Sequence, residues 1–207
     1  MKIAVLGATG RTGRLLVARA LERGHDVIAL ARRPEQADIS GNLRVVRADV
    51  ADPGSVAAAV EGADVVLSGL GITKTQDPAI LVDGAREIAS AAPRVIWLTS
   101  LGMGATQGAL GTLTGALLER VLRYEWDAKG EAGRVVRDVG GTTVHAGPLT
   151  DKSYRGNGNL LRAEEYEPRL FPPLAPRAGI ADLMVAEAET PRFPDADTVA
   201  VFLRQTY

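Results

Sequence analysis

The sequence contains no cysteine, and this absence removes several kinds of chemistry at once. A chain without cysteine forms no disulfide, carries no thiolate nucleophile and offers no sulfur ligand to zinc or to an iron–sulfur cluster. Any redox chemistry that this protein performs must therefore belong to a bound cofactor.

An excess of positive charge is also missing. The 24 lysines and arginines are balanced by 25 aspartates and glutamates, which leaves no general positive field to hold a nucleic-acid backbone or an anionic membrane surface. Long apolar runs are absent as well. A membrane span needs about 20 apolar residues, and the first run, Ile3–Leu6, is too short even for a signal peptide. We therefore expect no nucleic-acid partner, no membrane partner and a cytoplasmic location.

The apolar residues instead form short runs at intervals along the chain. These runs are Ile3–Leu6, Val27–Leu30, Leu43–Val46, Val65–Leu67, Val95–Leu98 and Thr142–Val144. Such runs are typical of strands that are covered on both faces. Segments of helical periodicity lie between them, with Asp52-Pro53 and Asp77-Pro78 as expected helix starts. The alternation predicts an α/β fold with a Rossmann-type doubly wound parallel sheet, in one domain over residues 1–207.

The pattern weakens after Pro148. Residues 152–159 are polar and residues 168–176 contain four prolines, whereas residues 180–189 have helical periodicity and residues 198–203 have the pattern of a last strand. We expect residues 148–207 to form a short, loop-rich C-terminal extension on the substrate side.

Three glycines follow the first strand directly and precede the first amphipathic helix. A residue without a Cβ lets the chain turn sharply and lets a pyrophosphate approach the helix N-terminus, where free N–H groups and the helix dipole favour negative charge. The third glycine allows the helix to pack closely on the strand. We therefore expect a nucleotide cofactor here, the alternative being a tight turn without a ligand. The candidate residues are Gly7, Thr9, Gly10, Arg11, Thr12 and Gly13.

The spacing of these glycines, G-x-x-G-x-x-G with Ala8 and Thr9 inside it, resembles the turn of the atypical short-chain dehydrogenase/reductase superfamily. Landmarks farther along are similar to those of its NAD(P)H-binding, NmrA-like group, and within that group to the biliverdin-IXβ/flavin reductases. They include Leu30–Arg33, Asp83–Arg86 and Gly147–Asp151. The resemblance implies an NADP-linked reductase with an open site for flat, conjugated acceptors such as flavins or linear tetrapyrroles.

Two arginines favour NADP(H) over NAD. Arg32 and Arg33 lie about 20 positions after Gly13, where NAD-selective proteins carry an acidic residue for the ribose 2′-hydroxyl. Guanidinium groups make charge-assisted, often bidentate contacts with a phosphate. Arg11 is a third candidate phosphate ligand. The alternative is a pair of solvated surface arginines.

Further cofactor contacts are expected where later strands end. The resemblance implies that Asp49 and its neighbour contact adenine, although this segment also has the pattern of a capping turn. Small residues after the fourth strand leave room for the backbone to pass beside the nicotinamide ribose. The expected contacts at these strand ends are Asp49, Val50, Gly69, Leu70, Gly71 and Thr99.

Three residues are candidates for catalysis. Ser100 ends the fifth strand at the carboxyl edge, where open α/β sheets place their chemistry, and it resembles a serine that related reductases direct at the substrate; the alternative is a capping hydroxyl. Lys129 resembles the lysine of the group's K-x-x-x-E helix, with Gly133 at the acid position. His145 is either a proton donor or a buried structural histidine.

The tyrosine base that short-chain reductases usually carry, Tyr-x-x-x-Lys, is missing. Lys129 follows Tyr124 by five residues, roughly 140° around a helix, so the two side chains do not face each other. Reduction of an isolated ketone needs a positioned acid, whereas a flavin, a quinone or another extended system spreads the charge and takes its proton from solvent. We therefore favour an NADPH-dependent reductase of a planar, conjugated small molecule.

Two other functions stay open. The same cofactor site is suited to a non-catalytic NADP(H) sensor that acts through a protein partner, or to an NAD(P)-dependent epimerase or dehydratase. The segment after Pro148 is short for a sugar-nucleotide domain, which disfavours the last of these. The small, apolar segment Gly102–Leu118 is either a lid over the substrate or an oligomer face, so a monomer and a homodimer are both possible.

Overall fold

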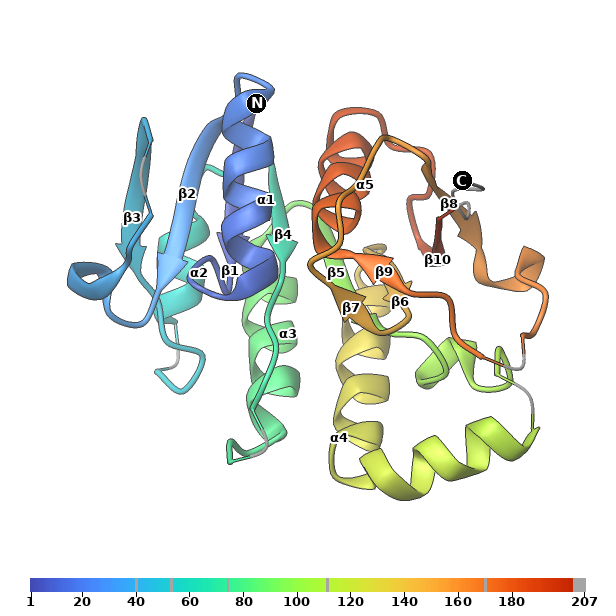
Figure 1. The fold of residues 1–207 in the computed structure, drawn as a ribbon. Coiled ribbons are helices and arrows are strands. Elements are labelled where there is room, and N and C mark those ends of the chain that lie inside the picture. The colour runs from blue at the N-terminus through green and yellow to red at the C-terminus, as the bar shows by residue number, and fades with distance from the viewer. Residues whose placement is uncertain (40, 53, 74, 111, 170, 203–207) are drawn as a thin grey trace.

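An eight-stranded sheet runs through the protein (Figure 1). The structure, a computed structural model, describes residues 1–39, 41–52, 54–73, 75–110, 112–169 and 171–202, without the side chains of residues 112–119 and 121–124. In spatial order the strands are β3 (Leu43–Arg47), β2 (Asp26–Ala31), β1 (Lys2–Leu6), β4 (Val65–Ser68), β5 (Val95–Ser100), β6 (Thr142–Ala146), β10 (Ala196–Phe202) and β8 (Gly158–Arg162). Neighbouring strands are parallel except for β10 and β8. The predicted Rossmann-type doubly wound sheet is confirmed.

The order of the strands fixes where a ligand binds. The chain builds outward from β1 to β2 and β3, then returns to place β4 on the other side of β1. In open α/β sheets, ligands bind outside the carboxyl ends of the strands at this reversal. The segments that follow β1 and β4 there are residues 7–10 and 69–71.

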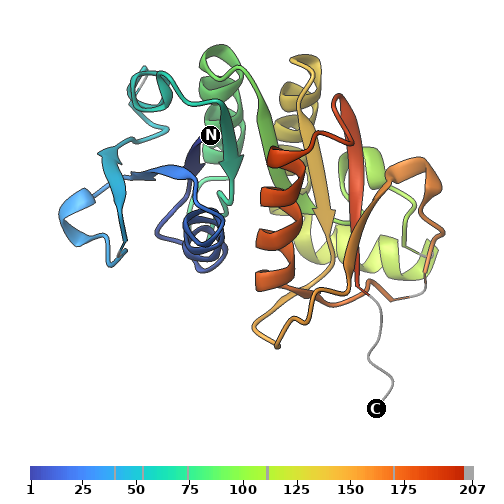
Figure 2. The same ribbon diagram turned by 90° about the horizontal axis from the view of Figure 1, so that it is seen from above.

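Helices cover both faces of the sheet (Figure 2). One face carries α1 (Arg11–Glu22) and α5 (Arg177–Glu189), and the other carries α2 (Ser55–Val60), α3 (Ala79–Ala91) and α4 (Thr112–Asp138). Short 3-10 turns stand at Pro34–Gln36, Gly104–Thr106 and Ala163–Glu165. In α3 the residues Leu81, Ala85 and Ile88 are all buried, as their spacing predicts for one apolar face laid on the sheet.

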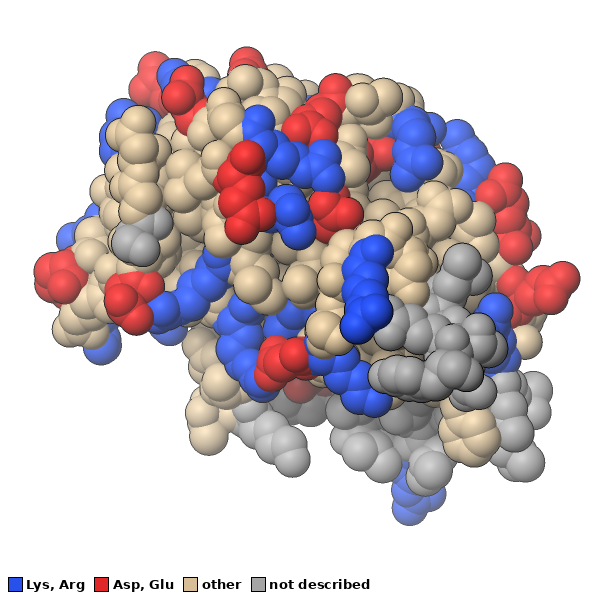
Figure 3. Space-filling model, turned by 45° about the horizontal axis from the view of Figure 1, so that its top comes forward, with Lys and Arg blue, Asp and Glu red and all other residues tan. Residues whose placement is uncertain are grey.

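Charged groups join α1 to α5 on the first face. The guanidinium of Arg23 lies 2.6 Å from the carboxylate of Asp182 and 2.6 Å from that of Glu189. The view in Figure 3 shows acidic and basic side chains interspersed on the surface rather than a broad field of one sign. This arrangement agrees with the near-equal numbers of acidic and basic residues.

The C-terminal extension contributes more to the sheet than its sequence predicts. The helix and the last strand expected there are present as α5 and β10, but β8 also lies within the extension and takes in Asn159, the last residue of the expected polar loop. Strand β8, at Gly158–Arg162, was not predicted from the sequence. Its residues are only weakly strand-like, and pairing with β10 stabilises the strand.

The proline-rich segment is held against the carboxyl edge. Two short strands, β7 (Leu149–Thr150) and β9 (Ala175–Pro176), pair with each other. A Cβ added to Gly147 would lie 1.9 Å from the backbone oxygen of Pro173, so the backbone there passes directly over the end of β6. This contact requires a residue without a side chain.

The two expected helix starts differ in outcome. The carboxylate of Asp77 accepts a hydrogen bond of 2.9 Å from the backbone N–H of Ala79, the first residue of α3. Helix α2 instead begins at Ser55 after Gly54, whose φ is +81°. The expectation that Asp52 caps this helix is therefore wrong, and Pro53 lies outside the described residues.

Glu187 is the most deeply buried acid of the described residues, with no exposed surface. Its carboxylate lies 3.1 Å from the guanidinium of Arg94 and accepts backbone N–H groups of Arg192 and Phe193 at 3.0 and 2.9 Å. Burial lowers the pKa of Arg94, against the opposing charge of Glu187. One side chain therefore ties the end of α5 to the segment before β5.

We predict that Glu187→Ala lowers the free energy of unfolding by about 3 kcal/mol, because it removes the counter-charge of the partly buried Arg94 and the acceptor of two backbone N–H groups. Chemical denaturation measures this difference. The exposed Glu61 is the matched control, and Glu61→Ala should change stability by less than about 0.5 kcal/mol. Equal losses in the two variants would contradict the role given to Glu187.

Candidate cofactor and active site

The glycine-rich turn after β1 is packed against itself. A Cβ added to Gly13 would lie 2.0 Å from the backbone oxygen of Gly7, and Gly7 has a φ of +73°. The N–H of Gly10 donates to the oxygen of Gly7 at 2.9 Å. Only glycine fits at Gly13 without moving the backbone, and positive φ also favours glycine at Gly7.

The start of α1 is open for a ligand. Gly10 is the N-cap residue, and no side chain caps the first turn of this helix. The first N–H groups of a helix have no partner within the helix, and together with the helix dipole they attract anions. Within the turn, Thr9, Gly10 and Arg11 are exposed, whereas Thr12 and Gly13 are buried. The backbone at Gly10 and Arg11 is therefore accessible to a phosphate.

The segment after β4 lies against this turn. A Cβ on Gly7 would approach the backbone nitrogen of Leu70 to 3.0 Å, and one on Gly69 would approach the nitrogen of Gly13 to 3.3 Å. The structure thus brings Gly69 and Leu70 to the glycine-rich turn, and Gly71 follows them on the exposed side. Backbone from two strand ends lines the reversal point.

Arg32 and Arg33 follow β2 at the same edge, and both are exposed. Among the described residues, neither has an acidic partner within ion-pair distance, and Arg33 makes a hydrogen bond of 3.4 Å to Gln36. Their positive charges are therefore available to an anionic ligand.

Arg11 lies differently from expectation, because it already has a protein partner. Its guanidinium contacts the carboxylate of Asp151, which Arg177 also contacts at 2.8 Å. The ion pair joins the glycine-rich turn to the segment after β7. Both side chains of the first pair are more than half exposed, and such exposed pairs contribute little stability. A phosphate can compete with Asp151 for Arg11.

Asp49 and Thr99 stand at the ends of β3 and β5. The carboxylate of Asp49 accepts the N–H of Ala51 at 3.2 Å, and the Ser55 hydroxyl bonds the backbone of Asp49 on both sides. These bonds fold Asp49 and Val50 into a local turn before α2, with both residues half-buried at the edge. The buried hydroxyl of Thr99 has no hydrogen-bond partner among the described residues.

Ser100 and Lys129 are brought together from β5 and α4. The ammonium of Lys129 donates a hydrogen bond of 3.1 Å to the hydroxyl of Ser100. Lys129 also lies 2.7 Å from the carboxylate of Glu125, one helical turn earlier. Glu125 was not among the residues predicted from the sequence, although its E-x-x-x-K spacing relative to Lys129 is a recognisable signal.

Two features of the sequence analysis fall largely outside the described residues. The side chain of Tyr124 lies outside the described residues. In the segment Gly102–Leu118, residue 111 and the side chains of residues 112–118 lie outside them as well. In the described part of that segment, Met103 and Leu110 are buried within the protein.

His145 is buried next to the backbone of Ser100. Its side chain is 3% exposed, with Nδ1 at 3.0 Å from the Thr106 hydroxyl and Nε2 at 3.1 Å from the Thr143 hydroxyl. Nδ1 also lies 3.3 Å from the backbone oxygen of Ser100. The imidazole thus joins the backbone of Ser100 to Thr106 in the turn after it.

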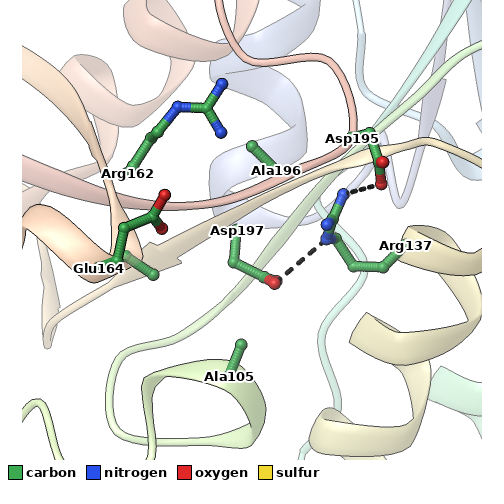
Figure 4. A pocket seen from close by; sticks show the side chains of 8 residues that line it. Ala105, Arg137, Arg162, Glu164, Asp195, Ala196 and Asp197 are labelled. Atoms are coloured by element: carbon green, nitrogen blue, oxygen red, sulfur yellow. Dashed lines mark hydrogen bonds and ion pairs between the residues drawn. The ribbon is translucent and has the colours of Figure 1, made fainter.

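Asp197 completes the network on the far side of His145. Burial alone would raise the pKa of Asp197, but hydrogen bonds from His145 and Thr143, with the charges of His145 and Arg137, lower it to about 2. The carboxylate borders a pocket of about 310 Å³ at the start of β10. In Figure 4, Arg137 reaches both Asp195 and Asp197. The pocket adjoins the amino end of β10, away from the carboxyl edge.

The fold, the glycine-rich turn and the open first turn of α1 define a class of protein, the NAD(P)-binding Rossmann-type proteins. The chain belongs to the NAD(P)H-binding family, which it matches over residues 7–191. A segment is also 35% identical over 96 residues to an isoflavone reductase homologue of Zea mays, covering 42% of this chain and 31% of that protein. The matches to curated relatives span between 8% and 31% of those relatives' lengths.

Solved structures with the same fold cover the whole chain. ChuY, an anaerobillin reductase from Escherichia coli O157:H7, has a TM-score of 0.76 at 20% identity, with 100% of both chains covered. A short-chain dehydrogenase/reductase of Veillonella parvula in complex with NADP has a TM-score of 0.79 at 16% identity, covering 100% of this chain and 96% of that one. At these identities the similarity shows the fold. In the described part of the chain, no helix is both long and apolar enough to cross a membrane.

We predict that Gly13→Ala weakens NADPH binding at least tenfold, because the new Cβ pushes the start of α1 away from the oxygen of Gly7. Quenching or enhancement of nucleotide fluorescence during titration measures the affinity. Gly133 is the control: it is also a helical glycine, but a Cβ there would meet only a Thr143 methyl, at 3.9 Å. Unchanged binding in Gly13→Ala would contradict the assigned role of the turn.

The lowered pKa of Asp197 predicts a pH-dependent contribution to stability. The contribution is fully present above the ordinary carboxyl pKa and is lost as the pH falls from about 4 towards 2. At pH 7 we expect Asp197→Asn to cost about 1–2 kcal/mol, after allowance for partial exposure, and at pH 2 to cost almost nothing. Denaturation at both pH values measures it, with the exposed Asp138→Asn as control. A cost that does not change with pH would refute the assignment.

Proposed function

We propose that this protein is an NADPH-dependent reductase of a planar, conjugated small molecule such as a flavin or a quinone. The observation that carries the proposal is the meeting of three features at one sheet edge: an open helix start, two arginines that have no acidic partner among the described residues, and a serine held by a lysine. NADPH, when bound, supplies a hydride to the acceptor.

The residues at the edge fit NADP(H). In the turn at Gly7–Gly13 the backbone packs too closely for a side chain at Gly13, and the exposed backbone at Gly10 leaves the start of α1 accessible to a phosphate. The buried hydroxyl of Thr99 lacks a partner among the described residues, and buried polar groups are nearly always satisfied, here in our proposal by the bound cofactor. Arg32 and Arg33 supply the charge that a 2′-phosphate requires.

Ser100 is arranged to donate a proton or a hydrogen bond. An ammonium group has three donors and no acceptor, so in the 3.1 Å contact Lys129 donates and Ser100 accepts. The hydroxyl proton of Ser100 is then free to point towards a substrate. In our proposal Ser100 and Lys129 are the catalytic residues, and His145 serves to hold the backbone of Ser100.

A conjugated acceptor suits this arrangement. A serine hydroxyl is a weak acid, even when a neighbouring ammonium polarises it, so it stabilises a charge that is spread over many atoms better than it protonates a localised alkoxide. Beyond this, the protein must hold the nicotinamide ring and the planar acceptor close enough, and in the right orientation, for hydride transfer. Gly71 after β4 is exposed, and a Cβ there would meet no atom within 4 Å, which in our proposal leaves room for the nicotinamide ring and a flat acceptor.

The test is the oxidation of NADPH, followed at 340 nm, with FMN, a quinone and an aldehyde panel as acceptors. The proposal expects turnover with FMN or the quinone and a decrease of at least tenfold in kcat for Ser100→Ala. Tight NADPH binding without oxidation of any acceptor would instead support the redox sensor. Fast turnover of aldehydes with none for FMN and quinone would overturn the choice of acceptor.

We predict that the double variant Arg32→Gln/Arg33→Gln weakens NADPH binding by about 10- to 100-fold, as expected for the loss of two charge-assisted phosphate contacts. NADH binding should change less than twofold, since NADH has no 2′-phosphate. Titration of both nucleotides with each protein gives the ratio. Arg44→Gln, an exposed arginine within β3, is the control. Equal weakening for NADH and NADPH would contradict the assignment of these arginines to the 2′-phosphate.

A further inference from the structure

The contact between Lys129 and Ser100 depends on where a long, flexible side chain is held. A lysine side chain has a flexible four-carbon stem that ends in an ammonium group. It keeps one position only when the N–H groups of the ammonium have fixed partners. The structure gives Lys129 two such partners: the hydroxyl of Ser100 at 3.1 Å and the carboxylate of Glu125 at 2.7 Å. Lys129 and Glu125 are each 20% exposed, so water competes weakly with these contacts.

We infer that Glu125 is a positioning residue that holds the ammonium of Lys129 against Ser100. This inference rests on the proposed function, because it concerns the same catalytic pair. Glu125 precedes Lys129 by four residues on α4, which is the favourable order for an ion pair on a helix. The carboxylate draws the ammonium to the side of α4 that faces the end of β5, where Ser100 lies.

No other acid among the described residues contacts Lys129. Glu131, two residues later on α4, pairs with Arg86 of α3 at 2.7 Å. Four residues after Lys129 stands Gly133, which has no side chain and packs near Thr143. The charge that fixes Lys129 therefore comes from the preceding turn of the helix, at Glu125.

The consequence for the reaction concerns the serine. While Glu125 holds one donor of Lys129, a second donor points at the oxygen of Ser100, and the serine's proton stays directed away from the lysine. Without the carboxylate the ammonium is free to move into water, and the hydroxyl loses the charge that polarises it. Cofactor binding at the glycine-rich turn does not involve this contact.

The test compares Glu125→Gln with Glu131→Gln, a glutamate on the same helix whose partner is elsewhere. With the acceptor that the wild type reduces best, we expect Glu125→Gln to lower kcat about fivefold, the size of one partly buried ion pair, with KM for NADPH unchanged. Glu131→Gln should leave kcat unchanged. In a Lys129→Met background, Glu125→Gln should have no further effect, because its influence passes through the lysine. An equal loss in both backgrounds would overturn the inference.

A crystal structure of the Glu125→Gln variant provides a readout that needs no activity. We expect the nitrogen of Lys129 to leave the oxygen of Ser100, while the wild type and Glu131→Gln keep the two within hydrogen-bond distance. If Lys129 stays on Ser100 in Glu125→Gln, the positioning role is wrong, whatever the kinetics. If the lysine moves in the variant, but the wild-type protein does not oxidise NADPH with any of the acceptors tested, the proposed function fails and the positioning role stands.

Discussion

The contact between the backbones of Gly7 and Gly13 sets the position of everything at the carboxyl edge. The start of α1 packs directly against the residue that follows β1: a methyl group added to Gly13 would lie 2.0 Å from the backbone oxygen of Gly7. Because the helix begins so close to the strand, its free N–H groups point over the end of β1. Residues that follow β2, β4 and β5 reach the same place only because the parallel sheet aligns their ends.

The proposed chemistry uses residues from both halves of the chain. The proposed cofactor site consists of turns, in which glycines allow close backbone packing and Arg32 and Arg33 supply positive charge. The proposed acceptor site consists of Ser100 on β5 and Lys129 on α4. The buried His145 contacts the backbone of Ser100 on one side and the half-buried carboxylate of Asp197 on the other. The residues that contact Ser100 from within the protein are held by hydrogen bonds. Arg32 and Arg33, which in our proposal contact the cofactor, are exposed. This is the division expected when a rigid base supports groups that must meet a mobile ligand.

The sheet and the glycine-rich turn could be predicted because their signals are local. Short β-branched runs indicate buried strands, and glycine spacing directly after a strand indicates a phosphate turn. The ion pair between Arg11 and Asp151 joins residues 140 positions apart, and no local pattern encodes it. Strand β8 was missed for the same reason, since it depends on pairing with β10. Glu125 is the opposite case: its spacing from Lys129 was visible, but only the structure shows that the pair faces Ser100.

The most direct test of the account is a crystal structure of the protein with NADP⁺ bound. We predict that the pyrophosphate lies against the N–H groups at the start of α1, that the 2′-phosphate contacts Arg32 or Arg33, and that the nicotinamide ring lies beside Ser100. A nucleotide bound elsewhere, or bound with its nicotinamide ring away from Ser100, would contradict the central claim that this edge is both the cofactor site and the active site.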